Sequence, residues 1–198
     1  MPSEILIVDV EATCWRGAPP PGEEREIIEI GACLLCPSSG ERSARESLLV
    51  RPARSQVSPF CTELTGITSE MTATGIPFAE ACAELRRRYR SAERTWASYG
   101  DYDRKQFLAQ CASFGVDYPF GPRHLNVKAL FARQRRLRRQ VGMAGALKLL
   151  NIPLEGSHHR AGDDAWNIAA VLAATLRADD LSLERALELA GTCREPVD

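Results

Sequence analysis

The stretch ILIVDVEA, residues 5–12, is a short apolar run rich in β-branched residues that contains two acids. Such a run predicts a buried β-strand. Side chains alternate between the two faces of a strand, so Asp9 and Glu11 share one face, with Cα atoms about 7 Å apart. Two carboxylates at the end of a buried strand are unfavourable unless a cation meets them. Mg²⁺ or Mn²⁺ would do so, because both bind carboxylate oxygens; the alternative is a strand end that emerges into solvent.

The segments that follow predict a mixed α/β domain. Residues 27–36 and the segment SLLVRP, which ends at Pro52, indicate two antiparallel strands joined by the turn PSSGE. Residues 53–77 contain five Thr, two Pro and two Gly, which predicts a long irregular connection. Beyond it we expect strands in RTWASYG and HLNVKAL, a basic helix after the second of these, and helices at about 78–90, 102–114, 143–150, 162–176 and 182–190.

Length and composition indicate one globular domain. The 198 residues are 44% hydrophobic and 26% charged, which suits a chain with a sizeable core. We expect residues 1–191 to form a single domain and 192–198 to be a C-terminal tail. No apolar run approaches the roughly 20 residues of a membrane-spanning helix. The first residues lack a basic signal-peptide region, so we expect a cytoplasmic protein.

The charge is unevenly distributed along the chain. The formal net charge is −1, yet eight basic residues and no acid lie between Arg123 and Lys148. Residues 163–198 contain eight acids and three arginines. A basic face beside an acidic pocket suits a metal-dependent enzyme that acts on a phosphate backbone. The alternative is a solvated helix face.

The seven cysteines do not indicate a disulfide framework, because their number is odd. Cys33 and Cys36 form one CxxC inside an apolar run, with no second pair nearby. A zinc or redox site is one interpretation. Buried reduced thiols that behave as small hydrophobic side chains are the better one.

Two further motifs carry acids. In SHHRAGDDAWN, residues 157–167, a histidine precedes an aspartate by five residues, which places the imidazole on a loop and the carboxylate in the first turn of a helix. An imidazole with an unperturbed pKa near 6.5 suits a general base. In SYGDYD, residues 98–103, Asp101 and Asp103 lie between a predicted strand and a helix. Taken singly, the first of these motifs is more often made of capping and surface residues, and the second is an ordinary helix-start signal.

Together these motifs resemble those of the DEDDh class of 3′–5′ exonucleases. The resemblance covers nearly the whole chain, through DVEATCW (9–15), IIEIGA (27–32), CTELTGIT (61–68), SYGDYD (98–103) and HRAGDDAWNIA (159–169). The first and third of these are most similar to the Eri-type branch, whose members trim the 3′ ends of RNA. The resemblance implies a ribonuclease-H-like α/β fold, with a mixed five-stranded sheet flanked by helices.

The resemblance also assigns metal ligands. Asp9 and Glu11 match the first motif, Asp103 the second and Asp164 the third. Asp101 is the alternative for the second motif. The cofactors implied are two divalent cations, Mg²⁺ or Mn²⁺.

The general base follows from the pattern H-x-A-x-x-D. His159 and Asp164 satisfy it, and His159 would then deprotonate the attacking water. The other register pairs His158 with Asp163 and places Arg160 where the pattern has Ala, so the first register is preferred.

The walls of the substrate site are implied in the same way. The residues expected to hold the terminal nucleotide are Ala12, Thr13 and Trp15, with Leu64, Thr65 and Ile67 opposite. Trp15 is large enough to stack on the 3′ base; the alternative is a packing role.

The function implied is removal of 5′-nucleoside monophosphates from single-stranded 3′ ends, with RNA favoured. Alternatives are a DNA or short-oligonucleotide exonuclease, a polymerase proofreading subunit and a non-catalytic nucleic-acid-binding module. The expected partners are single-stranded RNA or DNA 3′ ends and no membrane; protein partners stay open. The arginines that are candidates for contact with the nucleic-acid backbone are Arg133, Arg135, Arg136, Arg138 and Arg139.

Overall fold

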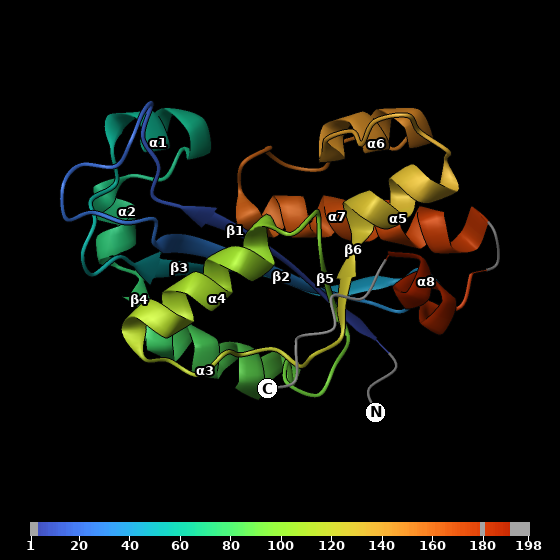
Figure 1. The fold of residues 1–198 in the computed structure, drawn as a ribbon, viewed down its shortest axis with the longest axis horizontal. Helices are drawn as coiled ribbons and strands as arrows, with labels where there is room; N and C mark the ends of the chain where they lie inside the picture. The colour runs from blue at the N-terminus through green and yellow to red at the C-terminus, as the bar shows by residue number, and fades with distance from the viewer. Residues whose placement is uncertain (1–3, 179–180, 191–198) are drawn as a thin grey trace.

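A mixed β-sheet forms the middle layer of the structure (Figure 1). The computed structural model describes residues 4–178 and 181–190. The strands in this part of the chain are β1 (Ile5–Ala12), β2 (Ile27–Leu35), β3 (Arg42–Arg51), β4 (Ile76–Pro77), β5 (Trp96–Ser98) and β6 (His124–Asn126). Their order across the sheet is β4-β3-β2-β1-β5-β6. β1 pairs antiparallel with β2 and parallel with β5, which puts it in the interior of the sheet.

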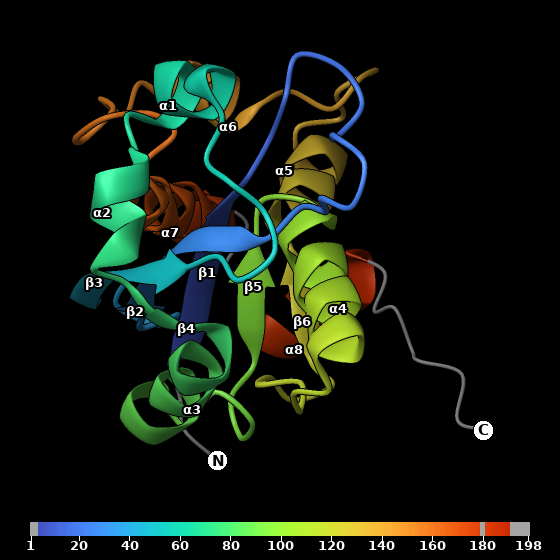
Figure 2. The same cartoon turned by 90° about the vertical axis from the view of Figure 1, so that its left-hand side faces the viewer.

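Separate sets of helices cover the two faces of the sheet (Figures 1 and 2). On one face lie α5 (Val127–Gln134), α6 (Met143–Leu150), α7 (Ala161–Ala178) and α8 (Leu183–Ala190); on the other lie α3 (Phe78–Tyr89) and α4 (Tyr102–Phe114). This arrangement confirms the predicted ribonuclease-H-like α/β architecture.

The alternation of side chains along β1 decides where its acids point. Ile5 and Ile7 pack into the core under α5, α6 and α7, whereas the side chains of Leu6, Val8 and Val10 pack toward α3 and α4. Because Asp9 and Glu11 continue the series of Ile5 and Ile7, both carboxylates lie on the α7 side of the sheet.

The number of strands differs from the prediction. The expected sheet had five strands, but the described residues add a sixth, β4, which pairs parallel with the end of β3 at Val50 and Arg51. β4 is two residues long and contains Pro77, so neither alternation nor β-propensity marks it in the sequence.

The prediction of an irregular connection at 53–77 is wrong. This segment contains two short helices, α1 (Pro59–Thr65) and α2 (Ser69–Ala73). The hydroxyl oxygen of Ser58 accepts the backbone N–H of Cys61 at 3.0 Å, and that of Thr68 accepts the backbone N–H of Met71 at 3.3 Å. Thr68, one of the five threonines that suggested a loop, is therefore a helix cap, as is Ser58.

The basic helix is also shorter than predicted. α5 ends at Gln134, so of the five arginines expected on it only Arg133 is helical. The N–H of Leu137 donates to the carbonyl of Ala132 at 2.9 Å, and Arg136 has a left-handed φ of 50°. These are features of a Schellman helix terminus, which usually uses glycine. Without a glycine, the sequence has no residue that marks this end.

The predicted helix at 182–190 is confirmed as α8. The hydroxyl oxygen of Ser182 accepts the N–H of Arg185 at 3.2 Å, as expected of a cap. Within the described ranges, no helix has both the length and the apolar character needed to cross a membrane. The predicted tail at 192–198 lies outside the described residues.

The CxxC motif does not form a site. Cys33 is buried on β2, where its thiol lies 3.5 Å from the carbonyl oxygen of Ala165. Cys36, which follows the strand, is partly exposed, and its sulfur lies 3.3 Å from the hydroxyl oxygen of Ser38. The two thiols therefore do not converge on one metal.

Candidate active site

Four acids meet at the carboxyl end of β1. Asp9 and Glu11 come from the strand itself, Asp103 from the first turn of α4 and Asp164 from the first turn of α7. All four line one open pocket of about 310 Å³, together with His158 and His159. All five residues predicted to be catalytic thus come together, from segments up to 155 residues apart, the separation of Asp9 and Asp164.

Three of the acids are close enough to share a cation. One carboxylate oxygen from each of Asp9, Glu11 and Asp164 lies within 4.8 Å of the others. Asp103 adjoins this group, because its carboxylate accepts the backbone N–H of Val10, the residue between Asp9 and Glu11, at 3.1 Å.

The pKa values show that this cluster is electrostatically unfavourable without a cation. Burial raises the pKa of Asp9 well above its usual range, and repulsion from Asp103 and Asp164 adds to the shift. Burial and the nearby Asp164 carboxylate raise the pKa of Glu11 to about 8. Burial raises the pKa of Asp103 to about 6. A divalent ion would reverse these shifts, and an all-oxygen donor set of this kind fits Mg²⁺ or Mn²⁺.

A single glycine lets α7 bring Asp164 to the strand. Gly31 lies opposite Asp9 in the β1–β2 ladder. A Cβ atom on Gly31 would lie 1.9 Å from the carbonyl oxygen of Ala161, the first residue of α7. The glycine of the IIEIGA motif therefore allows the helix backbone to touch the sheet beside the acids.

The two histidines occupy the loop before α7. Nδ1 of His158 lies 3.0 Å from a carboxylate oxygen of Asp164, and the backbone N–H of His159 donates to the same carboxylate at 3.0 Å. Nδ1 of His159 lies 3.9 Å from Glu11 Oε1. The two rings stack with centroids 4.1 Å apart. Burial lowers the pKa of His159, helped by the neighbouring His158, so its ring is neutral near pH 7 and able to accept a proton.

The alternative acids lie outside this pocket. Among the described residues, Asp101 precedes α4 and lines a different depression, with Lys128 and Asn126. The carboxylate of Asp163 accepts the N–H of Ser157 at 2.6 Å and forms an ion pair with Arg45. Asp103 and Asp164 therefore remain the better assignments for the second and third motifs.

The residues expected to hold the nucleotide are mostly buried. Ala12, Thr13, Thr65 and Ile67 have little exposed surface, whereas the exposed fraction of Leu64 is 41%. The hydroxyl of Thr13 donates to the carbonyl of Glu24, and that of Thr65 to the carbonyl of Cys61. These two threonines hold the fold around the pocket. Trp15 is half-buried, so Trp15 and Leu64 keep some side-chain surface exposed, but none of the six residues lines the acidic pocket.

Six further residues line the pocket and were not predicted from the motifs as site residues. They are Val10, Tyr99, Tyr102, Gly142, Met143 and Ile168. Tyr99 and Tyr102 belong to the SYGDYD motif, of which only the two aspartates were predicted to be site residues. Tyr102 is 45% exposed, and the hydroxyl of Tyr99 donates to the carbonyl of Val141 at 3.0 Å. Because the two tyrosines alternate with the acids of this motif, the sequence could have predicted that they line the pocket. Gly142 and Met143 at the start of α6 could not be predicted in this way, because they are distant in the chain from every motif.

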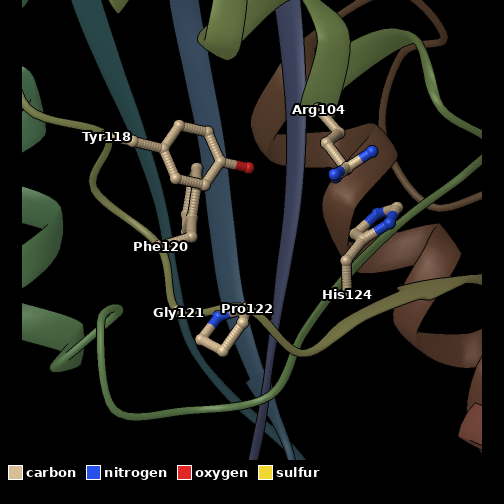
Figure 3. A pocket seen from close by; sticks show the side chains of 6 residues that line it. All are labelled: Arg104, Tyr118, Phe120, Gly121, Pro122 and His124. Carbon is tan, nitrogen blue, oxygen red and sulfur yellow. The ribbon is translucent and has the colours of Figure 1, made fainter. Parts of the chain in front are cut away.

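A second, smaller pocket shares no lining residue with the acidic pocket (Figure 3). Its volume is about 170 Å³, and its lining consists of Arg104, Tyr118, Phe120, Gly121, Pro122 and His124. Figure 3 shows Arg104 and His124 on one side and Tyr118 and Phe120 on the other. Burial lowers the pKa of His124 to about 4, and its Nε2 lies 2.9 Å from the hydroxyl oxygen of Ser98. His124 is therefore a neutral histidine bonded within the fold.

Comparison with known families identifies the enzyme class. The sequence profile of the RNase T exonuclease family matches residues 6–172, which include all four acids and both histidines of the pocket. This chain belongs to that exonuclease family. The predicted DEDDh-class 3′–5′ exonuclease is thereby confirmed at the level of family and enzyme class.

Two relatives are similar along most of this exonuclease chain. The Drosophila melanogaster 3′–5′ exonuclease Snipper is 30% identical over 197 residues, which cover 88% of this chain and 70% of that protein. The Rattus norvegicus 3′–5′ exoribonuclease 1 is 32% identical over 177 residues, covering 84% of this chain and 51% of that protein. The chain therefore spans about half the length of its mammalian relative.

Solved structures confirm the fold. A full-length 3′-exonuclease matches with a TM-score of 0.80 and 29% identity, over 90% of this chain and 83% of that one. The nuclease domain of 3′hExo, a DEDDh family member bound to rAMP, matches with a TM-score of 0.78 and 27% identity, over 89% of this chain and 92% of that domain.

Proposed function

We propose that this exonuclease removes 5′-nucleoside monophosphates one at a time from single-stranded 3′ ends, with RNA favoured over DNA. The observation that carries the proposal is the convergence of four carboxylates and two histidines in one open pocket. The preference for RNA is supported by the relatives that are named exoribonucleases and by the neighbour bound to rAMP.

Two divalent cations, Mg²⁺ or Mn²⁺, are the cofactors proposed. Asp9, Glu11 and Asp164 would hold them, with Asp103 as a further ligand, because these oxygens surround one small volume. When bound, the ions would stabilise the negative charge that develops on the scissile phosphate. The carboxylates themselves would fix the cations at the end of β1, whose preceding residues are buried in the core.

His159 is the proposed general base. Its ring lines the pocket, and its lowered pKa keeps it neutral, so it can accept a proton from the attacking water at a ring nitrogen. Nδ1 of His158 is already within hydrogen-bond distance of Asp164. That bond makes His158 the weaker candidate for the base.

The substrate contacts are proposed to come from two sides. Trp15 would stack on the terminal base and Leu64 would lie against the nucleotide, since both present side-chain surface next to buried neighbours. The arginines after α5 would contact the phosphate backbone. Those on the segment that leads toward Gly142 at the pocket rim are Arg135, Arg136, Arg138 and Arg139.

The test is a time course on 5′-labelled single-stranded RNA and DNA of one sequence. Each strand is incubated with Mg²⁺, Mn²⁺ or EDTA, beside an Asp164→Ala control. We expect a metal-dependent ladder that shortens from the 3′ end, runs faster on RNA and is absent in the control. A faster ladder on DNA would overturn the RNA preference, and no ladder on either strand from a folded, metal-loaded protein would favour a binding module. The cytoplasmic location stays a prediction.

A further inference from the structure

A buried ion pair fixes the loop that carries the histidines. Glu29 on β2 has none of its surface exposed, and it receives hydrogen bonds from both the loop–helix junction and β3. Nη2 of Arg160 donates to Oε1 at 2.8 Å, the backbone N–H of Ala161 donates to Oε2 at 2.8 Å, and the hydroxyl of Ser47 donates to Oε1 at 2.5 Å. Both oxygens of this carboxylate are therefore bonded to the start of α7.

The position of Glu29 ties that junction to the acids. Glu29 lies directly opposite Glu11 in the β1–β2 ladder. Its partner Arg160 follows His159 and precedes the first residue of α7. One ion pair therefore connects the strand beside Glu11 to the residue beside His159.

The loop needs such a restraint because its backbone is unusual. His159 has a φ of 64°, a left-handed conformation that is uncommon for residues other than glycine. Such a conformation persists where the flanking contacts over-determine it. Here Asp164 accepts the N–H of His159 on one side, and Glu29 holds Arg160 and Ala161 on the other.

The charges also argue for a specific pair. Glu29 adds a fifth carboxylate beside the four acids of the pocket, and an unpaired buried carboxylate there would repel them. Arg160 supplies the compensating charge, while 35% of its side chain stays exposed. The role of Arg160 is therefore to balance the charge of Glu29 and not only to fill space.

We propose that Glu29 and Arg160 are positioning residues: their ion pair holds His159 and Asp164 in line with Asp9 and Glu11 without touching the substrate. The proposal rests on the function proposed above. It assigns a role to the glutamate of IIEIGA and to the arginine of HRAGDD beyond packing.

The chain offers a matched control on the same loop. Glu155, which precedes the histidines, forms an ion pair with Arg42 of β3 at 2.8 Å. This pair also joins the sheet to the loop, but Arg42 lies opposite Leu35, which pairs with Ile5 at the other end of β1 from Glu11. Breaking this pair measures what a general loosening of the loop does.

The experiment compares Arg160→Ala, Arg160→Lys and Glu29→Gln with Arg42→Ala, and measures kcat, KM, Mn²⁺ binding and Tm for each. For Arg160→Ala we expect kcat to fall about 10- to 100-fold, as is typical for residues that orient metal-site ligands. KM should change little and Arg160→Lys should recover part of the activity, whereas Tm should fall because the buried Glu29 carboxylate loses its charged partner. Arg42→Ala should keep kcat within about 2-fold of the wild type.

Chemical rescue supplies a readout that a structural defect would not give. Guanidinium chloride at non-denaturing concentration should restore part of the kcat of Arg160→Ala, whereas NaCl at equal ionic strength should not. A wild-type kcat for Arg160→Ala, or a decrease without rescue that follows the drop in Tm, would overturn the positioning role. A wild type that shows no metal-dependent ladder would instead overturn the proposed function. Should Glu29→Gln fail to fold, the Arg160 variants still decide the question.

Discussion

At the scale of single residues, the two adjacent histidines have different surroundings. His158 is bonded through its ring to Asp164, whereas His159 uses its backbone N–H for that carboxylate and leaves its ring near Glu11. The structure thus gives the two histidines different contacts. In the sequence, only the alanine at position 161, which the pattern H-x-A-x-x-D requires, favoured His159 over His158.

This difference predicts unequal effects of substitution. His159→Ala should lower kcat about 10²- to 10⁴-fold, the usual contribution of a general base, whereas His158→Ala should lower it by a smaller factor. Single-turnover cleavage of labelled RNA measures both. If His158→Ala abolishes turnover and His159→Ala does not, the preferred register is wrong.

The raised carboxyl pKa values predict a pH-dependent stability. The pKa of Glu11 is about 8 in the folded protein, against 4.5 for an unperturbed glutamate. The folded state therefore binds this proton more tightly than the unfolded chain does, and its stabilising effect is fully present below about pH 4.5 and lost as pH rises through 8. In EDTA, Tm should decrease between about pH 5 and 8.

Metal addition and substitution check this sign. Mn²⁺ should raise Tm more at about pH 8 than at about pH 6, because deprotonated carboxylates bind it. Glu11→Gln should flatten the pH profile measured in EDTA. An equal decrease of Tm with pH in wild type and Glu11→Gln would show that Glu11 is not its cause, and a Tm that rises with pH in EDTA would contradict the prediction.

At the scale of elements, the contact between β2 and α7 controls the site. α7 brings Asp164 over β1 only because Gly31 has no side chain where the Ala161 carbonyl lies. The same contact leaves Glu29, two residues earlier on β2, facing the loop–helix junction.

Gly31→Ala should therefore displace the start of α7. The backbone cannot move aside without disturbing the sheet contact, so we expect a decrease of about 1–3 kcal/mol in the free energy of unfolding and a larger relative decrease in kcat. Urea denaturation and the RNA ladder measure the two effects. Gly17→Ala is the matched control, because a Cβ there meets nothing within 4 Å. Equal stability of the two variants would contradict the close approach.

At the scale of the whole molecule, the charges separate into two regions. The acids converge at the end of β1, and the arginines after α5 lie on the segment that leads to Gly142 at the pocket rim. The formal net charge of −1 hides this arrangement. A phosphate backbone could meet the arginines while its 3′ end enters the pocket.

This arrangement predicts how salt affects substrate binding. Replacing Arg135, Arg136, Arg138 and Arg139 by Gln should raise KM and reduce the salt slope of log KM by about 0.7 for each phosphate that the protein no longer neutralises. The kcat at saturating RNA should stay near that of the wild type. Measurements of KM across a range of KCl concentrations test this, and an unchanged slope would exclude these residues from binding the backbone.

The sequence by itself determined the secondary elements that carry the acids, and with them the family. The β-branched run at 5–12 forms a strand because both of its faces are apolar, and the alternation of its side chains put Asp9 and Glu11 on one face. The helix that begins near Asp164 was readable from its periodicity, and both this helix and the one near Asp103 from their acidic first turns, because these are local properties.

Only the tertiary structure decided how these elements meet. The approach of α7 at Gly31 and the Glu29–Arg160 pair depend on contacts between residues distant in the chain. The end of α5 depends on the left-handed backbone of Arg136, which no residue type marked. The two-residue strand β4 exists because β3 offers it a partner. Local propensity acts over a few residues, whereas the precision of an active site comes from long-range packing, and for this reason the ligands could be predicted but their supports could not.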